Sequence, residues 1–354
     1  MTAPHLSRRG LVLGTGAFAT SALLASCGNG AAEKPPAPPT GPALAEPTPV
    51  ATTEQFTTVT EQIHAAVKAA DEARDAKKLA PRVVGTAAEF RQKTYAMIAK
   101  VGEFSSTLQV PGAELIIPMT STGGKFPRTA IALVSGSEKG KVPFFMALQQ
   151  KDARSPYTTW GWAQQAAGIP MPNVEAAEVG AAPVSYEQDD LLLTPKAALD
   201  LYAKVLSDGV AADPKKLMGT DPFMTTRHKE IGDERKALNA GVNWDEAATV
   251  KEVYTVKKGD FVGIRTAPAK DAKIGGAIVM GTLLSNRRVL VKEGATMAYS
   301  QDNPYTKLIG KKKFTKEFRR DFGTVVALYI PPKGAKAKIQ PIGATIAELG
   351  ASGS

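Results

Sequence analysis

The sequence is poor in the residues from which disulfides, metal sites and many active sites are built. It has one cysteine and three histidines in 354 residues, and aromatic residues make up only 6% of the chain. A single cysteine excludes an internal disulfide framework, and this stock of Cys and His is too small for a Cys/His zinc site. The motifs Gly-x-Ser-x-Gly and His-Glu-x-x-His do not occur. We therefore expect no metal, no cofactor and no catalysis.

Long hydrophobic runs are also missing. The apolar stretch Leu11–Leu24 spans about 14 residues, whereas a transmembrane helix needs about 20. It follows Arg8 and Arg9, so residues 1–26 have the layout of an export signal peptide. The two arginines favour the twin-arginine (Tat) export route, with ordinary Sec export as the alternative.

The only cysteine follows this apolar stretch. Leu24-Ala25-Ser26-Cys27 resembles the bacterial lipobox, in which small residues precede a cysteine that receives a diacylglyceryl group. Each buried methylene of an acyl chain contributes about 0.8 kcal/mol to membrane binding. We expect Cys27 to anchor the protein to the cell membrane on its extracytoplasmic face. Removal of residues 1–26 lowers the formal charge from +10 to +8, because Arg8 and Arg9 are lost and no acid is.

Residues 27–53 predict an extended tether. Seven prolines fall between Pro35 and Pro49, and large apolar residues are almost absent. Such a segment cannot bury a core, and at about 3.1 Å per residue it reaches up to roughly 80 Å.

Two units with the same plan follow, residues 54–185 and 186–350, each with helical periodicity first and strand-like runs afterwards. Helices are predicted after Thr53, near 87–101, from Pro195 and near Asp221–Leu238. Strands are predicted at Thr107–Val110, Leu115–Met119, Arg128–Val134, Pro143–Gln149, Tyr157–Gln164, Thr249–Val256, Phe261–Ala267, Ala277–Leu284, Arg288–Lys292, Met297–Tyr299, Thr324–Ile330 and Ala337–Ile342. Residues 168–190, rich in Pro, Ala and acids, are predicted to cross between the units.

The two units also share sequence at a constant offset. Asp75-Ala76-Lys77-Lys78-Leu79 matches Asp213-Pro214-Lys215-Lys216-Leu217 at an offset of 138. This match and the common element order indicate an internal duplication. We expect an α+β fold of two related units, each with N-terminal helices packed on a curved, mostly antiparallel sheet, as in NTF2-like and cystatin-like proteins.

The C-terminal part supplies one family resemblance. The hydrophobic run 322–330, the turn Pro331-Pro332-Lys333-Gly334 and the strand-like run 339–344 resemble uncharacterised lipoproteins of actinobacteria. The lipobox and the Pro-rich tether fit the same group. The resemblance implies a location in the cell envelope and carries no activity with it.

Aromatic residues and histidines supply few candidate sites. Tyr157, Trp160 and Trp162 form one cluster, and the spacing of the two tryptophans places both on one face of a strand. There they either line a ligand pocket or fill the core. His64 and His228 lie in helical patterns without a second histidine at ligand spacing, which favours positions on helix surfaces.

Basic residues are concentrated near the C-terminus. Between Arg287 and Arg320 there are ten basic residues and three acids. Within this stretch Lys311, Lys312, Lys313, Lys316, Arg319 and Arg320 predict a basic surface patch. Outside the membrane its counterpart is an anionic lipid surface or a cell-wall polymer rather than nucleic acid. A generic solubilising surface is the alternative.

These observations predict a lipid-anchored envelope lipoprotein with a non-catalytic binding or scaffolding role. Two alternatives remain open: a ligand- or lipid-binding lipoprotein that serves a transport system, and an NTF2-like enzyme with a small pocket. The sequence identifies no protein partner.

Overall fold

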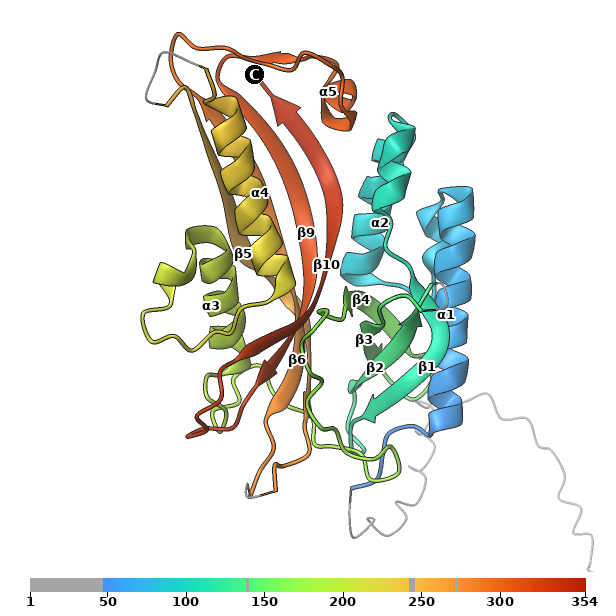
Figure 1. Cartoon of the computed structure of the whole chain (residues 1–354). Helices are drawn as coiled ribbons and strands as arrows, with labels where there is room; N and C mark the ends of the chain where they lie inside the picture. The colour runs from blue at the N-terminus through green and yellow to red at the C-terminus, as the bar shows by residue number, and fades with distance from the viewer. Residues whose placement is uncertain (1–46, 138–139, 242–245, 271–272) are drawn as a thin grey trace, which may run out of the picture. The chain divides into compact units, whose positions relative to one another are not determined.

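In its described residues, the first half of the chain contains two helices followed by four strands (Figure 1). The computed structural model describes residues 47–137, 140–241, 246–270 and 273–354. The elements of the first half are α1 (Thr53–Ala73), η1 (Ala76–Leu79), α2 (Gly85–Ile98), η2 (Gly102–Thr107), β1 (Pro111–Thr120), β2 (Arg128–Gly136), β3 (Phe144–Gln150) and β4 (Thr158–Gln164). Helix α1 buries Phe56, Ile63 and Val67 on one stripe, and Thr52 caps it one residue before the predicted start.

The second half repeats this order and adds a short excursion. Its elements are α3 (Pro195–Asp208), η3 (Val210–Ala212), α4 (Pro222–Leu238), β5 (Ala248–Arg265), β6 (Ala277–Val291), β7 (Met297–Ala298), α5 (Pro304–Ile309), β8 (Lys313–Phe314), β9 (Glu317–Ile330) and β10 (Gln340–Gly353). Two four-stranded antiparallel sheets result, in the orders β1-β2-β3-β4 and β10-β9-β6-β5. The predicted α+β class, with helices and mostly antiparallel sheets, is therefore confirmed.

The predicted strands are partly wrong in extent. Thr107–Val110 is not a strand, since Thr107 ends η2 and Leu108 to Val110 lie outside any strand. The runs Thr249–Val256 and Phe261–Ala267 belong to one strand, β5, which continues through a register shift between Lys257 and Phe261. Similarly, β10 begins at Gln340 and continues to Gly353, well past the predicted end at Ile342.

The two sheets share a buried apolar core. It combines Ile131, Phe145 and Trp160 of the first sheet with Ile278, Met280 and Val325 of the second. A second cluster lies between α1, α2 and the first sheet, and a third packs α3 against the second sheet. Helices and sheets are thus layered, and the core between the two sheets contains residues of both halves.

Backbone contacts also join the sheets at their edges. Beside β4, Gln164 N donates to Thr345 Oγ1 of β10 at 2.8 Å, and Ala166 N donates to Ile342 O at 2.8 Å. On the other side the crossing segment pairs with both sheets, through Ser121 with Ala181 and through Pro183 with Ile264. The predicted inter-unit crossing therefore connects the two halves through backbone pairing with both sheets.

A glycine lets α2 approach the second sheet. A Cβ atom at Gly323 of β9 would lie 2.1 Å from Phe90 Cζ of α2, far inside the contact distance. Only glycine leaves room for the Phe90 ring at this point. This close approach fixes a helix of the first half against a strand of the second.

The second sheet has two distinct ends. At one end β5 and β9 finish and β6 and β10 begin, since Arg265 pairs with Ala277, which pairs with Ile330. The described end of the predicted tether lies near this end, because Val50 N donates to Ser121 O at 2.9 Å and Ser121 pairs with the crossing segment. The opposite end carries α5, β7 and β8 (Figure 1). Among the described residues, no helix has the length and apolar character that spanning a bilayer requires.

Candidate functional site

The predicted export and lipidation residues lie outside the described part of the chain. Arg8, Arg9 and Cys27 all precede residue 47. Their roles therefore stay predictions.

The predicted aromatic pocket is not assembled. A register shift next to Leu148 places a bulge in β4, so Trp160 points into the core between the sheets and Trp162 into the core under the helices. The expectation that both indoles share one face is wrong, because a bulge reverses the alternation of side chains. Tyr157 is buried beside α1.

Trp162 does line a small cavity under α2. Arg91 stacks over its ring at 5.3 Å, and both side chains donate to Gln109 O. The cavity holds about 40 Å³ of space, which accommodates a few water molecules rather than a drug-sized ligand. Neither Trp160 nor Tyr157 lines it.

The predicted basic patch is only partly on the surface. Lys311, Lys312, Lys313, Lys316 and Arg319 are exposed. Arg320 is 9% exposed, and its guanidinium binds both carboxylate oxygens of Glu234 at 2.6 Å. Including Arg320 in a surface patch is therefore wrong, because its charge is neutralised inside the protein.

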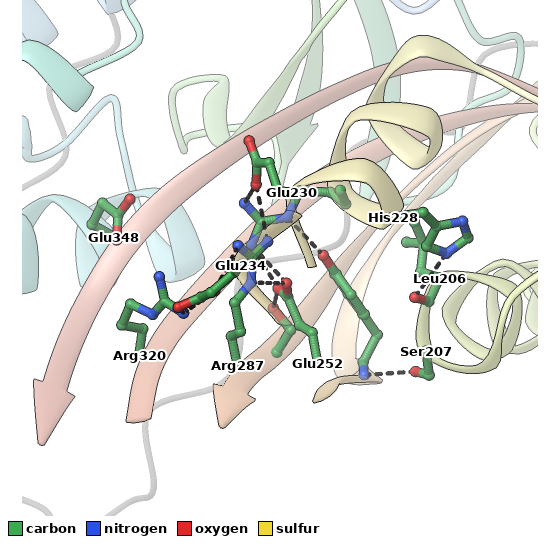
Figure 2. A network of polar contacts seen from close by, with 12 residues as sticks. Leu206, Ser207, His228, Glu230, Glu234, Glu252, Arg287, Arg320 and Glu348 are labelled. Carbon is green, nitrogen blue, oxygen red and sulfur yellow. Dashed lines mark hydrogen bonds and ion pairs between the residues drawn. The ribbon is translucent and has the colours of Figure 1, made fainter. Parts of the chain in front are cut away.

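Arg320 belongs to a cluster of charges between α4 and the second sheet (Figure 2), most of them buried, although the side chain of Glu230 is 45% exposed. At its centre, the fully buried Glu252 carboxylate of β5 accepts from Arg227 Nη2 at 2.8 Å and from Arg287 Nε at 2.9 Å. Ser285 Oγ donates to the same carboxylate at 2.8 Å. Burial by itself raises the pKa of Glu252, but Arg227 and Arg287 outweigh it and hold the pKa below its ordinary value.

The cluster neutralises its own charges. Arg287 Nη2 and Arg227 Nη1 each bind Glu230 Oε2 at 2.9 Å. We call the set Arg227, Glu230, Glu234, Glu252, Arg287 and Arg320 the arginine–glutamate cluster, in which three arginines face three glutamates. Its contacts fasten α4 to β5, β6 and β9. Its three arginine charges are each paired with a glutamate, although the buried Arg320 Nε has no hydrogen-bond partner.

Two further titratable side chains, Glu348 and His228, lie near this cluster. Glu348 of β10 accepts a hydrogen bond from Tyr305 Oη at 2.7 Å, and burial raises the pKa of its carboxyl above the ordinary value. On the other side of α4, His228 Nε2 lies 3.1 Å from Val205 O of α3. His228 is half-buried rather than on a fully solvated face, and His64 Nδ1 similarly contacts Pro111 O at 2.9 Å. Within the described ranges, no group of His, Cys, Asp or Glu is arranged to hold a metal ion.

A groove of about 440 Å³ lies beside the end of α3. Gly209 caps the C-terminus of helix α3, and its positive φ of 79° turns the chain into η3. The following turn is closed by Lys216 N, which donates to Asp213 O at 3.0 Å. Lys216 has a φ of 54°, a conformation that non-glycine residues seldom adopt.

The second wall of the groove comes from far along the chain. Gly219 N donates to Ile339 O at 2.7 Å, and Ile339 N donates to Leu217 O at 2.8 Å. These two hydrogen bonds place Lys338, at the end of the β9–β10 loop, beside the turn. The groove is lined by Val205, Val210, Ala211, Asp213, Pro214, Lys216, Met218, Gly219, Thr220, Met224 and Lys338.

The lining combines an apolar surface with two cations. Val210 is 66% exposed, an unusual position for a large apolar side chain. Asp213 is buried and its carboxylate accepts from Met218 N at 2.7 Å, so it serves the turn. Lys216 and Lys338 are exposed, and within the described residues neither makes an ion pair. We call this site the lysine-rimmed groove.

The sequence alone does not reveal this groove, although part of its wall lies in the repeated pentapeptide. Lys216 belongs to that pentapeptide, and Lys338 follows the Pro-Pro-Lys-Gly turn. Only the pairing of Met218 with Ile339 joins them. Comparison of the chain with protein-family models, curated proteins and solved structures finds no match. A function for this chain can therefore be inferred only from its own residues.

Proposed function

We propose that this protein is a lipid-anchored lipoprotein on the extracytoplasmic face of the cell membrane that binds an anionic amphiphile and does not act as a catalyst. The lysine-rimmed groove is the observation that carries the proposal. Its apolar lining suits an acyl chain, and Lys216 and Lys338 suit an anionic head group. Its volume of about 440 Å³ falls within the range of ligand sites, about 300–1,000 Å³.

The energetic terms for such a ligand are favourable. Burying a methylene group contributes about 0.8 kcal/mol, and the groove offers Met218, Met224 and the exposed Val210 as partners. A lysine near an anionic head group contributes about 1 kcal/mol. Because Lys216 and Lys338 have no carboxylate partner within the described residues, little is lost when an anion approaches them.

The predicted anchor on Cys27 supports a membrane ligand. Gln340, which begins β10 beside the groove, pairs with Tyr329 near the end of β9. This is the end of the second sheet near which the described end of the predicted tether lies. An anchor on Cys27 would hold the protein near the bilayer, where amphiphiles are concentrated.

The arginine–glutamate cluster supports the proposed groove because it holds α4, which supplies part of the groove wall. It fixes α4 through charges that are paired internally, while Met224 of α4 lines the groove. The cluster thus holds one wall in place without offering a free acid or base.

We also propose that the two halves arose by duplication of an NTF2-like or cystatin-like unit. Both halves have two helices followed by a four-stranded antiparallel sheet. The matched pentapeptides share one backbone hydrogen bond, from Lys78 N to Asp75 O at 3.2 Å and from Lys216 N to Asp213 O at 3.0 Å, although the first segment is the 3-10 helix η1 and Lys216 in the second has a φ of 54°. Lys78 is therefore the counterpart of Lys216 in the first half.

Binding of a fluorescent long-chain fatty acid tests the proposed function. The full chain carrying Cys27→Ala, which lacks the predicted acylation site, is titrated with the acid and with the matching neutral alcohol. Val210→Asp puts a charge into the groove and is expected to weaken binding at least about tenfold. Val179→Asp is the matched control, because Val179 is 60% exposed and does not line the groove.

A second comparison tests whether the lysines recognise the charge of the head group. Lys216→Gln with Lys338→Gln is expected to weaken binding of the acid by roughly thirtyfold and to leave the alcohol unchanged, at about 1 kcal/mol per lysine. Lys78→Gln serves as the control. Equal affinity of all variants for the acid, or no binding by the parent chain, overturns the proposal.

A further inference from the structure

A second groove lies at the same end of the second sheet as the lysine-rimmed groove. It holds about 400 Å³, close to the 440 Å³ of the lysine-rimmed groove. We call it the crossing groove, because part of its wall belongs to the predicted crossing segment. Its lining is mostly apolar and includes Pro170, Met171, Pro172, Ala269, Tyr329 and Ile342.

The two grooves border different parts of the core. Met218 and Met224 of the lysine-rimmed groove belong to the core that packs α3 against the second sheet. Ile342 of the crossing groove belongs to the core between the two sheets, and Met171 packs against the same core. The start of β10 therefore has one groove on each face of the second sheet.

Backbone hydrogen bonds hold the walls of the crossing groove. Ala267 N, just after β5, donates to Asn173 O of the crossing segment at 3.0 Å. Ala166 N, just before that segment, donates to Ile342 O of β10 at 2.8 Å. Asn173, Ala267 and Ile342 all line the groove. The fold itself therefore forms this groove before any ligand binds.

A thin ridge at the start of β10 separates the two grooves. Gln340 lines the crossing groove, and its Nε2 donates at 2.9 Å to the backbone oxygen of Thr220, which lines the lysine-rimmed groove. Lys338 lines both grooves. It is exposed and makes no ion pair within the described residues. One cation is therefore available to a ligand in either groove.

This shared lysine favours one ligand with two chains over two ligands with one chain each. Among the described residues that line the crossing groove, Lys338 alone carries a charge. Two anionic head groups at Lys338 would lie close together, and like charges repel each other. A single head group that carries two apolar chains avoids this repulsion, and each chain covers apolar surface. Lys216, on the rim of the first groove, brings a second positive charge to the same head group.

We propose that the ligand is an anionic lipid with two acyl chains, which binds across the start of β10 with one chain in each groove and its head group at Lys338. This inference rests on the proposed function, since one of the two chains occupies the lysine-rimmed groove. It adds the class of amphiphile and a second subsite, the crossing groove.

Two short lipids with the same head group, dioctanoyl phosphatidic acid and octanoyl lysophosphatidic acid, test the number of chains. Each is titrated below its micelle concentration into the full chain carrying Cys27→Ala, by isothermal titration calorimetry. The parent chain is expected to bind one phosphatidic acid per protein, at least about tenfold more tightly than the lysolipid, because the second chain buries additional apolar surface.

A charge in the crossing groove tests the second subsite. Ala269→Asp is expected to weaken phosphatidic acid binding at least about tenfold and lysolipid binding less than about threefold. Val210→Asp, in the lysine-rimmed groove, is expected to weaken both. Ala176→Asp is the matched control, because Ala176 is an exposed alanine of the crossing segment that lines neither groove.

Three outcomes overturn the inference. Equal affinity of the parent chain for the two lipids means that the second chain is not bound. Binding of two lysolipids per protein means that separate ligands occupy the grooves. Equal effects of Ala269→Asp and Ala176→Asp mean that the crossing groove is not the second subsite. Each of these outcomes is compatible with fatty-acid binding in the lysine-rimmed groove, whereas unchanged binding of every ligand by Val210→Asp contradicts the proposed function as well.

Discussion

Replacing Glu252 by Gln should cost the protein a large part of its stability. The Glu252 carboxylate is fully buried and receives hydrogen bonds from Arg227, Arg287 and Ser285. Glutamine preserves the size of the side chain but removes its charge, and its amide group presents N–H donors to guanidinium donors. Breaking a buried ion pair by removing one partner costs about 3–5 kcal/mol. Since folded proteins are stable by about 5–15 kcal/mol, this is a large fraction of the total.

Urea unfolding followed by circular dichroism measures this loss. Glu252→Gln should lower the midpoint strongly with little change in the denaturant slope. Glu246→Gln is the matched control, because Glu246 binds Arg235 at the surface, where a pair contributes about 0–1 kcal/mol. A loss below about 1 kcal/mol for Glu252→Gln would refute the reasoning, since it would mean that the cluster does not hold α4 on the sheet.

Three further predictions concern a titrating group, a packing contact and the anchor. Burial raises the pKa of Glu348 above its ordinary value. The stabilisation that the protonated Glu348 carboxyl provides is therefore complete below the unfolded-state pKa and is lost as the pH rises through the folded-state pKa. Glu348→Gln should therefore gain stability relative to the parent chain between about pH 4 and about pH 8, in urea unfolding at both pH values; a constant difference contradicts this. Gly323→Ala places a Cβ 2.1 Å from Phe90 Cζ and should destabilise by about 1–3 kcal/mol in the same assay, whereas an unchanged midpoint would show that α2 shifts freely. Cys27→Ala should release the protein from membranes in cell fractionation, and continued incorporation of labelled fatty acid would contradict the lipobox assignment.

The helices and the positions of most strands were predictable from the sequence, while the extent of several strands and the faces of their side chains were not. The apolar stripe of α1 and the prolines at the start of α3 and α4 are local signals, and the structure follows them. The face of Trp160 depends on a bulge in β4, which no spacing rule reveals. The single strand β5 depends on pairing with β6 across a register shift. These are properties of strand pairing and not of the local sequence.

The charged residues show the same limit. Arg287 and Arg320 lie in a basic stretch whose composition predicts an exposed surface patch. They are buried instead, because they form ion pairs with Glu252 and Glu234 on other elements. Lys216 and Lys338 come together only through backbone hydrogen bonds between residues 217–219 and Ile339. Composition locates charge along the chain, but only the fold determines which charges remain available to a ligand.

The most direct test of the groove as the binding site is a photoreactive long-chain fatty acid with its reactive group on the acyl chain. The full chain carrying Cys27→Ala is irradiated with this probe, digested and analysed by mass spectrometry. Labelling is expected in residues 205–224, which include Val205, Val210, Met218 and Met224 of the groove lining, and it should fall when Val210→Asp is introduced. Labelling confined to other segments, or labelling that an excess of unlabelled fatty acid does not reduce, would contradict the account.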